Sequence, residues 1–159
     1  MKKTIKEDYT DQIILSVIQE KDLQKICTWK NDFELVGLNQ AYPFPTCLKE
    51  AEEWFNRNHY DKNQVLFGIY HIQTQELLGI VRLSFIDWVS RRSEIGLFIG
   101  NKEKRGKGHG KIALKNIIHY AFNKLNLRKL YLYVIETNVN ALALYKNSGF
   151  KQEGFLEKH

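Results

Sequence analysis

The chain has 159 residues, of which 43% are hydrophobic and 26% charged, and it carries a formal net charge of +6. These values are typical of one globular domain, and a content of only two prolines and ten glycines excludes a low-complexity or collagen-like chain. No apolar run approaches the roughly 18 residues of a membrane span, and the basic N-terminus lacks the apolar segment of a signal peptide, so we expect a cytoplasmic protein.

The first third of the chain predicts one strand and two helices. Residues 12–18 are apolar enough to form a strand, and a short helix follows that ends near Asn31. We expect residues 35–45 to be irregular, because two prolines stiffen the end of this segment. Thr46 then has a suitable side chain to cap a second helix with an apolar face.

The middle of the chain predicts an antiparallel meander. Residues 65–71 and 77–89 have the composition of strands, and the short polar turn between them favours a hairpin. A further antiparallel strand is expected at 94–99, after a turn near residues 90–92.

A glycine-rich loop connects this meander to the clearest predicted helix. The sequence Arg105-Gly-Lys-Gly-His-Gly110 places glycine at every second position. The apolar stripe of the following helix consists of Leu114, Ile117, Ile118, Ala121, Phe122 and Leu125. Free main-chain N–H groups and the positive end of the helix dipole suit a phosphate, and Arg105, Lys107 and Lys111 add positive charge. The loop therefore predicts a phosphorylated cofactor.

The last part of the chain predicts a strand at 130–134, a short helix at 138–147 and a strand from Phe150 onward. The complete order is β α α β β β α β α β, which indicates a mixed α/β fold with a mostly antiparallel sheet flanked by helices. Without a repeat or a linker, residues 1–159 are expected to form a single domain.

Two common phosphate loops do not fit these residues. A dinucleotide fingerprint needs a third glycine where the chain has Lys111, and it opens a first βαβ unit. A Walker loop needs glycine at position 105 and Ser or Thr at position 112, where the chain has Arg105 and Ile112. A turn that only joins a strand to a helix remains an alternative.

The pattern that does fit is [QR]-x-x-G-x-[GA], met by Arg105, Gly108 and Gly110. A second motif downstream reads Asn138-x-x-Ala141-x-x-x-Tyr145-x-x-x-Gly149-Phe150. In these two motifs the chain resembles the GNAT superfamily of acyl-CoA-dependent N-acetyltransferases, and the resemblance extends from Ile13 to Glu157. It is most similar to the branch that holds the ribosomal-protein N-terminal acetyltransferases and the spermidine N-acetyltransferases. Features of that branch are Arg91-Arg92-Ser-Glu94-Ile-Gly96, Tyr120-Ala-Phe122 and Leu125-Asn126-Leu127.

The resemblance implies acetyl-CoA as the cofactor and a fold in which strand 94–99 splays from strand 130–134. The gap would expose main-chain groups near Phe98 and Ile99, which could hold the pantetheine arm and polarise the thioester carbonyl. The implied cofactor-binding residues are Phe98, Ile99, Arg105, Gly106, Lys107, Gly108, His109, Gly110, Lys111 and Asn138. His109 is expected beside the phosphates, and Asn138 either contacts pantetheine or caps its helix.

Tyr145 matches the family's tyrosine and is the candidate general acid. Proton donation from a phenol of pKa ~10 to a thiolate of pKa ~8.5 is uphill by about 2 kcal/mol, which an enzyme can supply. The alternative is that Tyr145 only packs on its helix.

Glu94 is the candidate base. A carboxylate of pKa ~4.3 faces a gap of roughly 8 kcal/mol to an ammonium, so Glu94 would sooner orient the amine through water. The alternative is a strand glutamate paired with Arg91 or Arg92.

The acceptor is expected to be a primary amine, either a protein N-terminus or a small molecule. Residues 29–55, which build the acceptor pocket in this architecture, are rich in aromatic side chains and have few carboxylates, which argues mildly against a polyamine. A polyamine or amino-sugar acetyltransferase, a non-catalytic acyl-CoA-binding sensor and nucleic-acid binding through residues 104–115 are the alternatives. We expect no nucleic-acid partner, no membrane and no metal, and Cys27 and Cys47 have no metal or redox spacing.

The C-terminus departs from the family pattern. The family usually adds a further strand after the segment that matches residues 150–157, whereas this chain stops at His159. The last predicted strand would then have an exposed edge. Either the tail was removed or is disordered, or a partner molecule, as in a homodimer, supplies the pairing.

Overall fold

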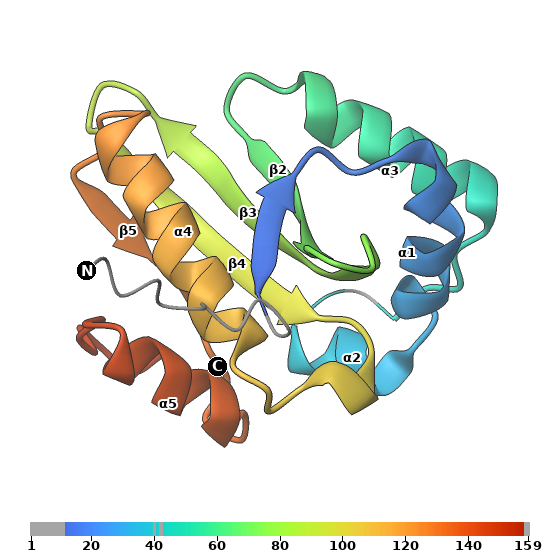
Figure 1. Cartoon of the computed structure of the whole chain (residues 1–159). Helices are drawn as coiled ribbons and strands as arrows, with labels where there is room; N and C mark the ends of the chain where they lie inside the picture. The colour runs from blue at the N-terminus through green and yellow to red at the C-terminus, as the bar shows by residue number, and fades with distance from the viewer. Residues whose placement is uncertain (1–11, 40, 42, 158–159) are drawn as a thin grey trace, which may run out of the picture.

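The computed structural model describes residues 12–39, 41 and 43–157, which form a five-stranded sheet with helices on both faces (Figure 1). The elements in chain order are β1 (Ile13–Ser16), η2 (Glu20–Asp22), α1 (Leu23–Lys30), α2 (Phe33–Leu38), α3 (Leu48–Tyr60), β2 (Val65–His71), β3 (Leu77–Asp87), β4 (Arg92–Ile99), η3 (Lys102–Lys104), α4 (His109–Asn123), β5 (Lys129–Tyr131) and α5 (Val139–Asn147). None of the helices in this described part is long and apolar enough to cross a membrane.

The strands follow one another across the sheet in the order β1-β2-β3-β4-β5. The first four pair antiparallel, and only β4 and β5 run parallel, joined through the crossover helix α4. The predicted hairpin of β2 and β3 and the predicted mixed, mostly antiparallel α/β fold are both confirmed.

One face of the sheet packs against α4. Leu114, Ile117 and Ala121 of the predicted apolar stripe are fully buried, and they contact a core that includes Val81 of β3 and Ile95 of β4. The period of the helix explains this burial, because these residues recur every third or fourth position. Phe122, at the margin of the same stripe, remains exposed.

The opposite face carries α1 and α3 and a second apolar cluster. Trp29 of α1 stands edge-on to Phe98 of β4, with ring centroids 5.9 Å apart. Tyr70 of β2 is buried in this cluster, and its hydroxyl donates to Asp22 Oδ2 at 2.9 Å. The two clusters place β4 between a core on one side and an aromatic layer on the other.

The N-terminal helices differ from the prediction in two places. Residues 35–45 were expected to be irregular, but α2 covers Phe33–Leu38 because Asp32 caps it by accepting from Leu35 N at 3.2 Å. The N-cap of α3 is Cys47 and not Thr46. Glu50 fixes this boundary by accepting a hydrogen bond from Cys47 N at 2.8 Å.

The C-terminal strands also differ. β5 ends at Tyr131, three residues before the predicted end, because its pairing with β4 stops there. Residues 150–157 were predicted to begin a strand, but they form no ladder with any residue of the described structure and are almost entirely exposed. A strand needs a neighbour for its N–H and C=O groups, and the three-residue β5 offers too short an edge.

Candidate active site

The strands β4 and β5 separate after a short parallel ladder. Their register pairs are Arg92↔Lys129, Ser93↔Leu130 and Glu94↔Tyr131, whereas β4 continues to pair with β3 as far as Ile99. Within the described part of the chain, the remaining half of β4 therefore has a strand neighbour on one edge only. This confirms the predicted splay of the central strands.

The direction of the main-chain groups shows what the gap exposes. Gly100 N donates to Leu78 O of β3 at 2.8 Å, and Arg91 O accepts from Lys129 N next to β5 at 3.2 Å. Because hydrogen-bonding direction alternates along a strand, even-numbered residues of β4 face β3 and odd-numbered residues face the gap. Leu97 and Ile99 therefore face the gap.

Phe98, which was expected to contribute main-chain groups together with Ile99, instead directs them toward β3. An ideal Cβ placed on Gly79 of β3 would in fact fall against the Phe98 carbonyl oxygen. The side chain of Phe98 still lines the hollow described next. The odd-numbered neighbour Leu97 takes its place as the residue with exposed main-chain groups.

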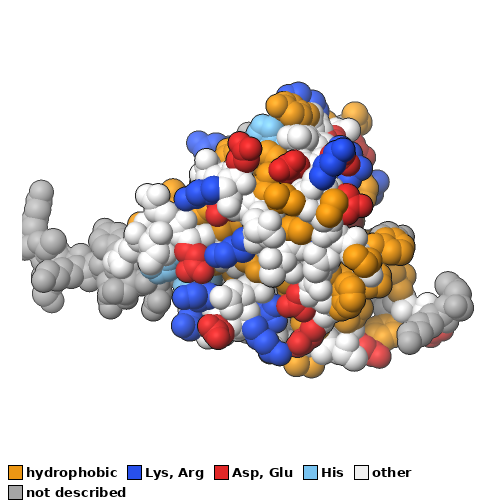
Figure 2. Space-filling model, turned by 90° about the vertical axis from the view of Figure 1, so that its right-hand side faces the viewer, with side chains coloured by type: hydrophobic (Ala, Val, Ile, Leu, Met, Phe, Trp, Pro, Cys, Tyr) orange, Lys and Arg blue, Asp and Glu red, His pale blue; other side chains and the backbone are white. Residues whose placement is uncertain are grey.

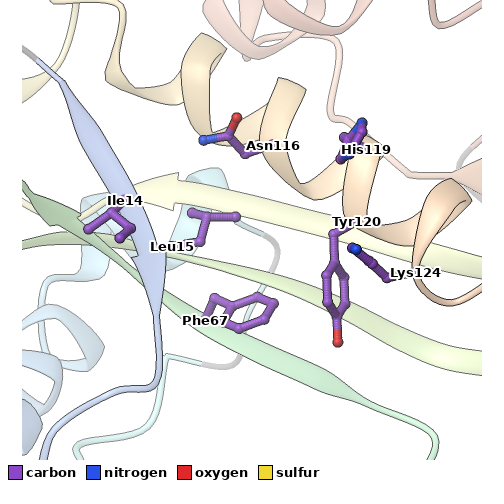
Figure 3. A pocket seen from close by; sticks show the side chains of 7 residues that line it. All are labelled: Ile14, Leu15, Phe67, Asn116, His119, Tyr120 and Lys124. Carbon is purple, nitrogen blue, oxygen red and sulfur yellow. The ribbon is translucent and has the colours of Figure 1, made fainter.

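A hollow of about 400 Å³ opens at the splay and reaches from α1 and α3 on one side to α5 on the other. Its walls include Trp29, Trp54, Glu94, Tyr133 and Tyr145. A second hollow of about 320 Å³ lies between β1, β2 and α4, away from the splay (Figure 3). There Tyr120 stands edge-on to Phe67, and none of the described residues that line the wall carries a carboxylate.

The glycine loop ends at the start of α4, where an ideal Cβ on Gly110 would lie 3.5 Å from the side chain of Leu97 in the unpaired half of β4. Gly106 and Gly108 have φ angles of +74° and +85°, which only glycine adopts without strain. Gly108 is the N-cap of α4, and its lack of a side chain leaves the first-turn N–H groups without a side-chain cap. α5 lies beside this turn (Figure 1), where Leu144 is 3.8 Å from an ideal Cβ on Gly110.

The basic residues of the loop have different surroundings. Arg105 folds back onto β4, with Nε donating to Ile99 O at 3.0 Å and Nη2 to Gly100 O at 3.4 Å. Its guanidinium therefore holds the loop against the strand. Lys107 and Lys111 are exposed on either side of the helix start and form no ion pair with any described residue.

His109 was expected to lie beside phosphate, but its side chain is only 3% exposed. The ring points into the protein, edge-on to His71 with centroids 6.3 Å apart, because the first turn of α4 directs this position toward the sheet. Neither ring nitrogen has a hydrogen-bond partner in the described structure. Only the main-chain N–H of His109 remains available at the helix start.

Tyr145 is buried at the junction of the core and the hollow. Its ring lies 5.5 Å from Phe150, and burial raises the pKa of its hydroxyl to about 12. No side chain or main-chain group of the described residues hydrogen-bonds this hydroxyl. The ring of Tyr145 therefore packs in the core, as the alternative prediction has it, while its hydroxyl stays unbonded beside the hollow.

Asn138 is the N-cap of α5. Its Oδ1 accepts from Ala141 N at 3.2 Å, and its Nδ2 donates to Leu38 O at 3.5 Å. The predicted capping role is therefore observed. The residue also lines the hollow, where a second N–H and a second lone pair of the amide are left.

Glu94 lines the hollow, and its carboxylate forms no ion pair or hydrogen bond with any residue that the structure describes. The alternative pairing with its neighbours does not occur. Arg92 pairs with Asp87 at 3.7 Å, and Arg91 donates to Asn126. The Glu94 carboxylate is therefore free to meet a ligand.

The structure adds two basic residues that the sequence patterns did not indicate, Lys30 of α1 and Arg82 of β3. Arg82 reaches the hollow only through the register of β3 on β4, which no local pattern reveals. Of the aromatic residues within 29–55, which were expected to build the acceptor pocket, Trp29 and Trp54 line the hollow, whereas Phe33 and Phe44 are exposed and do not line it. Tyr42 lies outside the described residues.

The cysteines and histidines form no recognisable metal site within the described ranges. No group of three or more His, Cys, Asp or Glu side chains there could hold a metal ion. Cys27 is buried and Cys47 is exposed, and both are free thiols.

Comparison with known proteins gives a consistent result. A family model described as an acetyltransferase (GNAT) domain matches residues 12–151. Spermidine N(1)-acetyltransferase of Vibrio cholerae is 30% identical over 145 residues, which are 91% of this chain and 82% of the relative. A putative ribosomal N-acetyltransferase of Bacillus subtilis, YdaF, is 32% identical over 102 residues, which are 64% of this chain and 54% of that protein.

Solved structures show the same relationship. The crystal structure of the spermidine N-acetyltransferase from Vibrio cholerae in complex with CoA and spermine has a TM-score of 0.84 at 30% identity. The match covers 91% of this chain and 84% of that one.

Proposed function

The chain belongs to the family of GNAT acetyltransferases, whose model matches residues 12–151, and we propose that it transfers the acetyl group of acetyl-CoA directly to the nitrogen of a primary amine. Membership makes it an N-acetyltransferase with acetyl-CoA as its cofactor, and confirms the resemblance of the sequence motifs. The proposal is carried by one arrangement: the open edge of β4 and Tyr145, whose hydroxyl is unbonded, line the same hollow, and the start of α4, which no side chain caps, lies against Leu97 of that edge.

The residues at the gap fit the chemistry of the cofactor. Acetyl-CoA supplies an acetyl thioester, a pantetheine arm rich in amides and a negatively charged diphosphate. The N–H groups at the start of α4, flanked by Lys107 and Lys111, suit the diphosphate. Leu97 and Ile99 offer N–H groups without a strand partner, which suit the pantetheine amides and can polarise the thioester carbonyl.

Tyr145 would stabilise the departing thiolate with its hydroxyl. With a pKa of about 12, complete donation of its proton to a thiolate of pKa ~8.5 is uphill by about 5 kcal/mol, more than an unperturbed phenol requires. We therefore assign Tyr145 a hydrogen bond to the sulfur, with transfer of the proton only as the bond to carbon breaks. Burial keeps the hydroxyl protonated, which this role needs.

Glu94 would receive the amine on the other side of the gap. Its carboxylate attracts an ammonium and can accept the proton through water, after which the neutral amine attacks. If Glu94 has this role, Glu94→Gln should shift the pH dependence of the rate while leaving the affinity for acetyl-CoA unchanged. An unchanged pH–rate profile would remove Glu94 from the mechanism.

The proposal is tested by calorimetry with acetyl-CoA and desulfo-CoA, followed by an amine panel in which release of the CoA thiol is measured. We expect binding of both cofactors and thiol release that depends on the amine. Tyr145→Phe separates an enzyme from a non-catalytic acyl-CoA sensor: an enzyme loses turnover and keeps binding, whereas a sensor shows no amine-dependent thiol release even in the native protein.

Self-association forms a second part of the proposal. The spermidine N-acetyltransferase of Vibrio cholerae has a dodecameric structure, and this chain has a short outer strand, β5, at the edge of its sheet. We propose a homo-oligomer, of which a dimer is the smallest form. Light scattering of the purified protein measures the state directly, and a monomer at all concentrations would contradict this part alone.

A further inference from the structure

We propose that the acceptor amine also carries an anionic group, a carboxylate or a phosphate, which Arg82 and Lys30 bind at the α1 side of the gap. The inference rests on the proposed acetyl transfer and names the class of acceptor for the same hollow. It follows from the placement of charge in the walls, which differs from that of the surrounding surface.

The walls of the hollow are biased toward positive charge. Lys30 and Arg82 are its basic residues, and Glu94 is the one carboxylate among the described residues that line it. The outer surface on the side of α1 and α3 shows no such bias, because basic and acidic side chains are interspersed over it (Figure 2). The positive charge is therefore a property of the hollow.

Arg82 is placed for recognition. It is exposed in a strand whose neighbours Val81 and Leu83 are fully buried, and it crosses β4 where Gly96 stands opposite. A Cβ on Gly96 would lie 3.2 Å from Arg82 Nε, so glycine provides the space that the guanidinium occupies. No ion pair or hydrogen bond joins this guanidinium to any residue in the described ranges.

An unpaired guanidinium has five N–H donors in a planar fork, which fits a carboxylate or a phosphate with two parallel hydrogen bonds. The neighbouring carboxylate does not satisfy it, since Glu94 stands opposite Ser84, two residues farther along β3. An acceptor with an ammonium near Glu94 and an anionic group near Arg82 would satisfy both charges of the wall.

Lys30 adds a second cation at the same end. Its Nζ lies 4.1 Å from the ring centroid of Trp54, which holds the side chain at the wall. Burial, and then the charges of Arg82 and Arg57, lower the pKa of Lys30, so the cations in this corner repel one another. A bound anion would relieve this repulsion, whereas the further ammonium groups of a polyamine would increase it.

Matched amines test the inference. Phenylalanine is compared with phenethylamine, and glucosamine 6-phosphate with glucosamine, each pair differing in the anionic group; spermidine is the polyamine. We expect kcat/KM to be about 10- to 100-fold higher for the anionic member of at least one pair, as hydrogen bonds to charged groups allow. A preference within the phenylalanine pair would identify the anionic group as a carboxylate, and a preference within the glucosamine pair would identify it as a phosphate.

Variants assign the effect to the wall. Arg82→Gln should abolish the preference within the pair, Arg82→Lys should restore part of it, and Lys30→Met should weaken it. Arg128→Gln removes an exposed arginine outside the hollow and serves as the control. Calorimetry should show unchanged affinity for acetyl-CoA in all four variants; weaker binding in Arg82→Gln would instead assign that residue to the cofactor and overturn the inference.

A second readout separates this inference from the proposed function. Direct binding of the amines to the CoA-bound protein is measured by calorimetry, with no turnover required. Preference for anionic amines without thiol release would contradict acetyl transfer and keep the anion site. Efficient acetylation of spermidine or of the neutral amines, with no gain from the anionic group, would keep acetyl transfer and overturn the anion site.

Discussion

The two edges of strand β4 have opposite roles. On the edge toward β3, seven register pairs run from Asp87↔Arg92 to Gly79↔Ile99. On the edge toward β5, three pairs are followed by a gap. The main-chain N–H and C=O groups of this eight-residue strand thus pair with β3 along one edge, whereas on the other edge about half of them have no strand partner among the described residues. The pairing with β3 therefore holds β4 in place along the half where its other edge is open.

The two faces of the sheet repeat this contrast. Where α4 packs on β3 and β4 the core is filled, and Ala113, Leu114 and Ile117 have no exposed surface. Around the gap, the helices α1 and α5 leave a hollow of about 400 Å³. We call the core between α4 and strands β3 and β4 the closed part, and the residues that line the hollow at the gap the open part. We therefore expect substitutions in the closed part to reduce the free energy of unfolding, and substitutions in the open part to change binding or turnover.

The largest effect is expected in the closed part. Leu114→Ala removes a fully buried side chain and should lower the free energy of unfolding by about 3 kcal/mol, since deletion of buried leucine side chains costs roughly 2–5 kcal/mol. Urea unfolding measures the change, with Lys115→Ala on the exposed side of the helix as the control. A loss below about 1 kcal/mol would show that this part is less tightly packed than the structure indicates.

Tyr145→Phe tests the open part. It removes only the hydroxyl at the gap and should lower kcat by about 100-fold, the typical contribution of a positioned acid, with little change in affinity for acetyl-CoA. Tyr120→Phe, the same chemical change at the other hollow, is the matched control (Figure 3). Equal effects of the two variants on kcat would remove the distinction between the parts.

The closed part is also the part that could be predicted from the sequence. The stripe of Leu114, Ile117 and Ala121 has a helical period, and the strands of the hairpin are bounded by polar turns, so both follow from local patterns. The spacing of its glycines also predicts the loop, and the structure shows why one of them is needed: Gly108 has a positive φ at the helix start. Local chemistry is sufficient for such elements.

The rest depends on contacts between distant segments. The early end of β5 results from divergence of two strands, and the unpaired residues 150–157 from the lack of a long neighbouring edge. Arg82 enters the hollow through cross-strand register with Gly96, and the burial of His109 depends on which way the first turn of α4 faces. No spacing along the chain encodes these relationships.

A pH titration of stability sharpens the assignment of Tyr145. Folding raises the pKa of this phenol from its ordinary value near 10 to about 12 because it is buried. The folded state therefore keeps a proton that the unfolded chain has lost, so the contribution is fully present below pH 10 and disappears as the pH rises toward 12.

At pH 11 this contribution should have fallen by about 1.4 kcal/mol. The free energy of unfolding of the native protein should thus decrease more between pH 9 and pH 11 than that of Tyr145→Phe. The pKa of Tyr70 is also raised by burial, but Tyr70 is present in both proteins and cancels in the difference. Parallel pH profiles for the two proteins would place the Tyr145 hydroxyl in water and weaken its role at the gap.

The smallest effect is expected where the two parts join, at the start of α4. Gly108 has a φ of +85° with no other atom within 4 Å of an added Cβ, so Gly108→Ala costs only backbone strain, about 1 kcal/mol. If the strain shifts the first-turn N–H groups, the affinity for CoA should fall by about 5-fold, which corresponds to the same energy. Gly154→Ala, with equal space and an ordinary φ, is the control and should change neither quantity. A loss of stability with unchanged CoA affinity would mean that this turn belongs to the closed part alone, and that the diphosphate is held elsewhere.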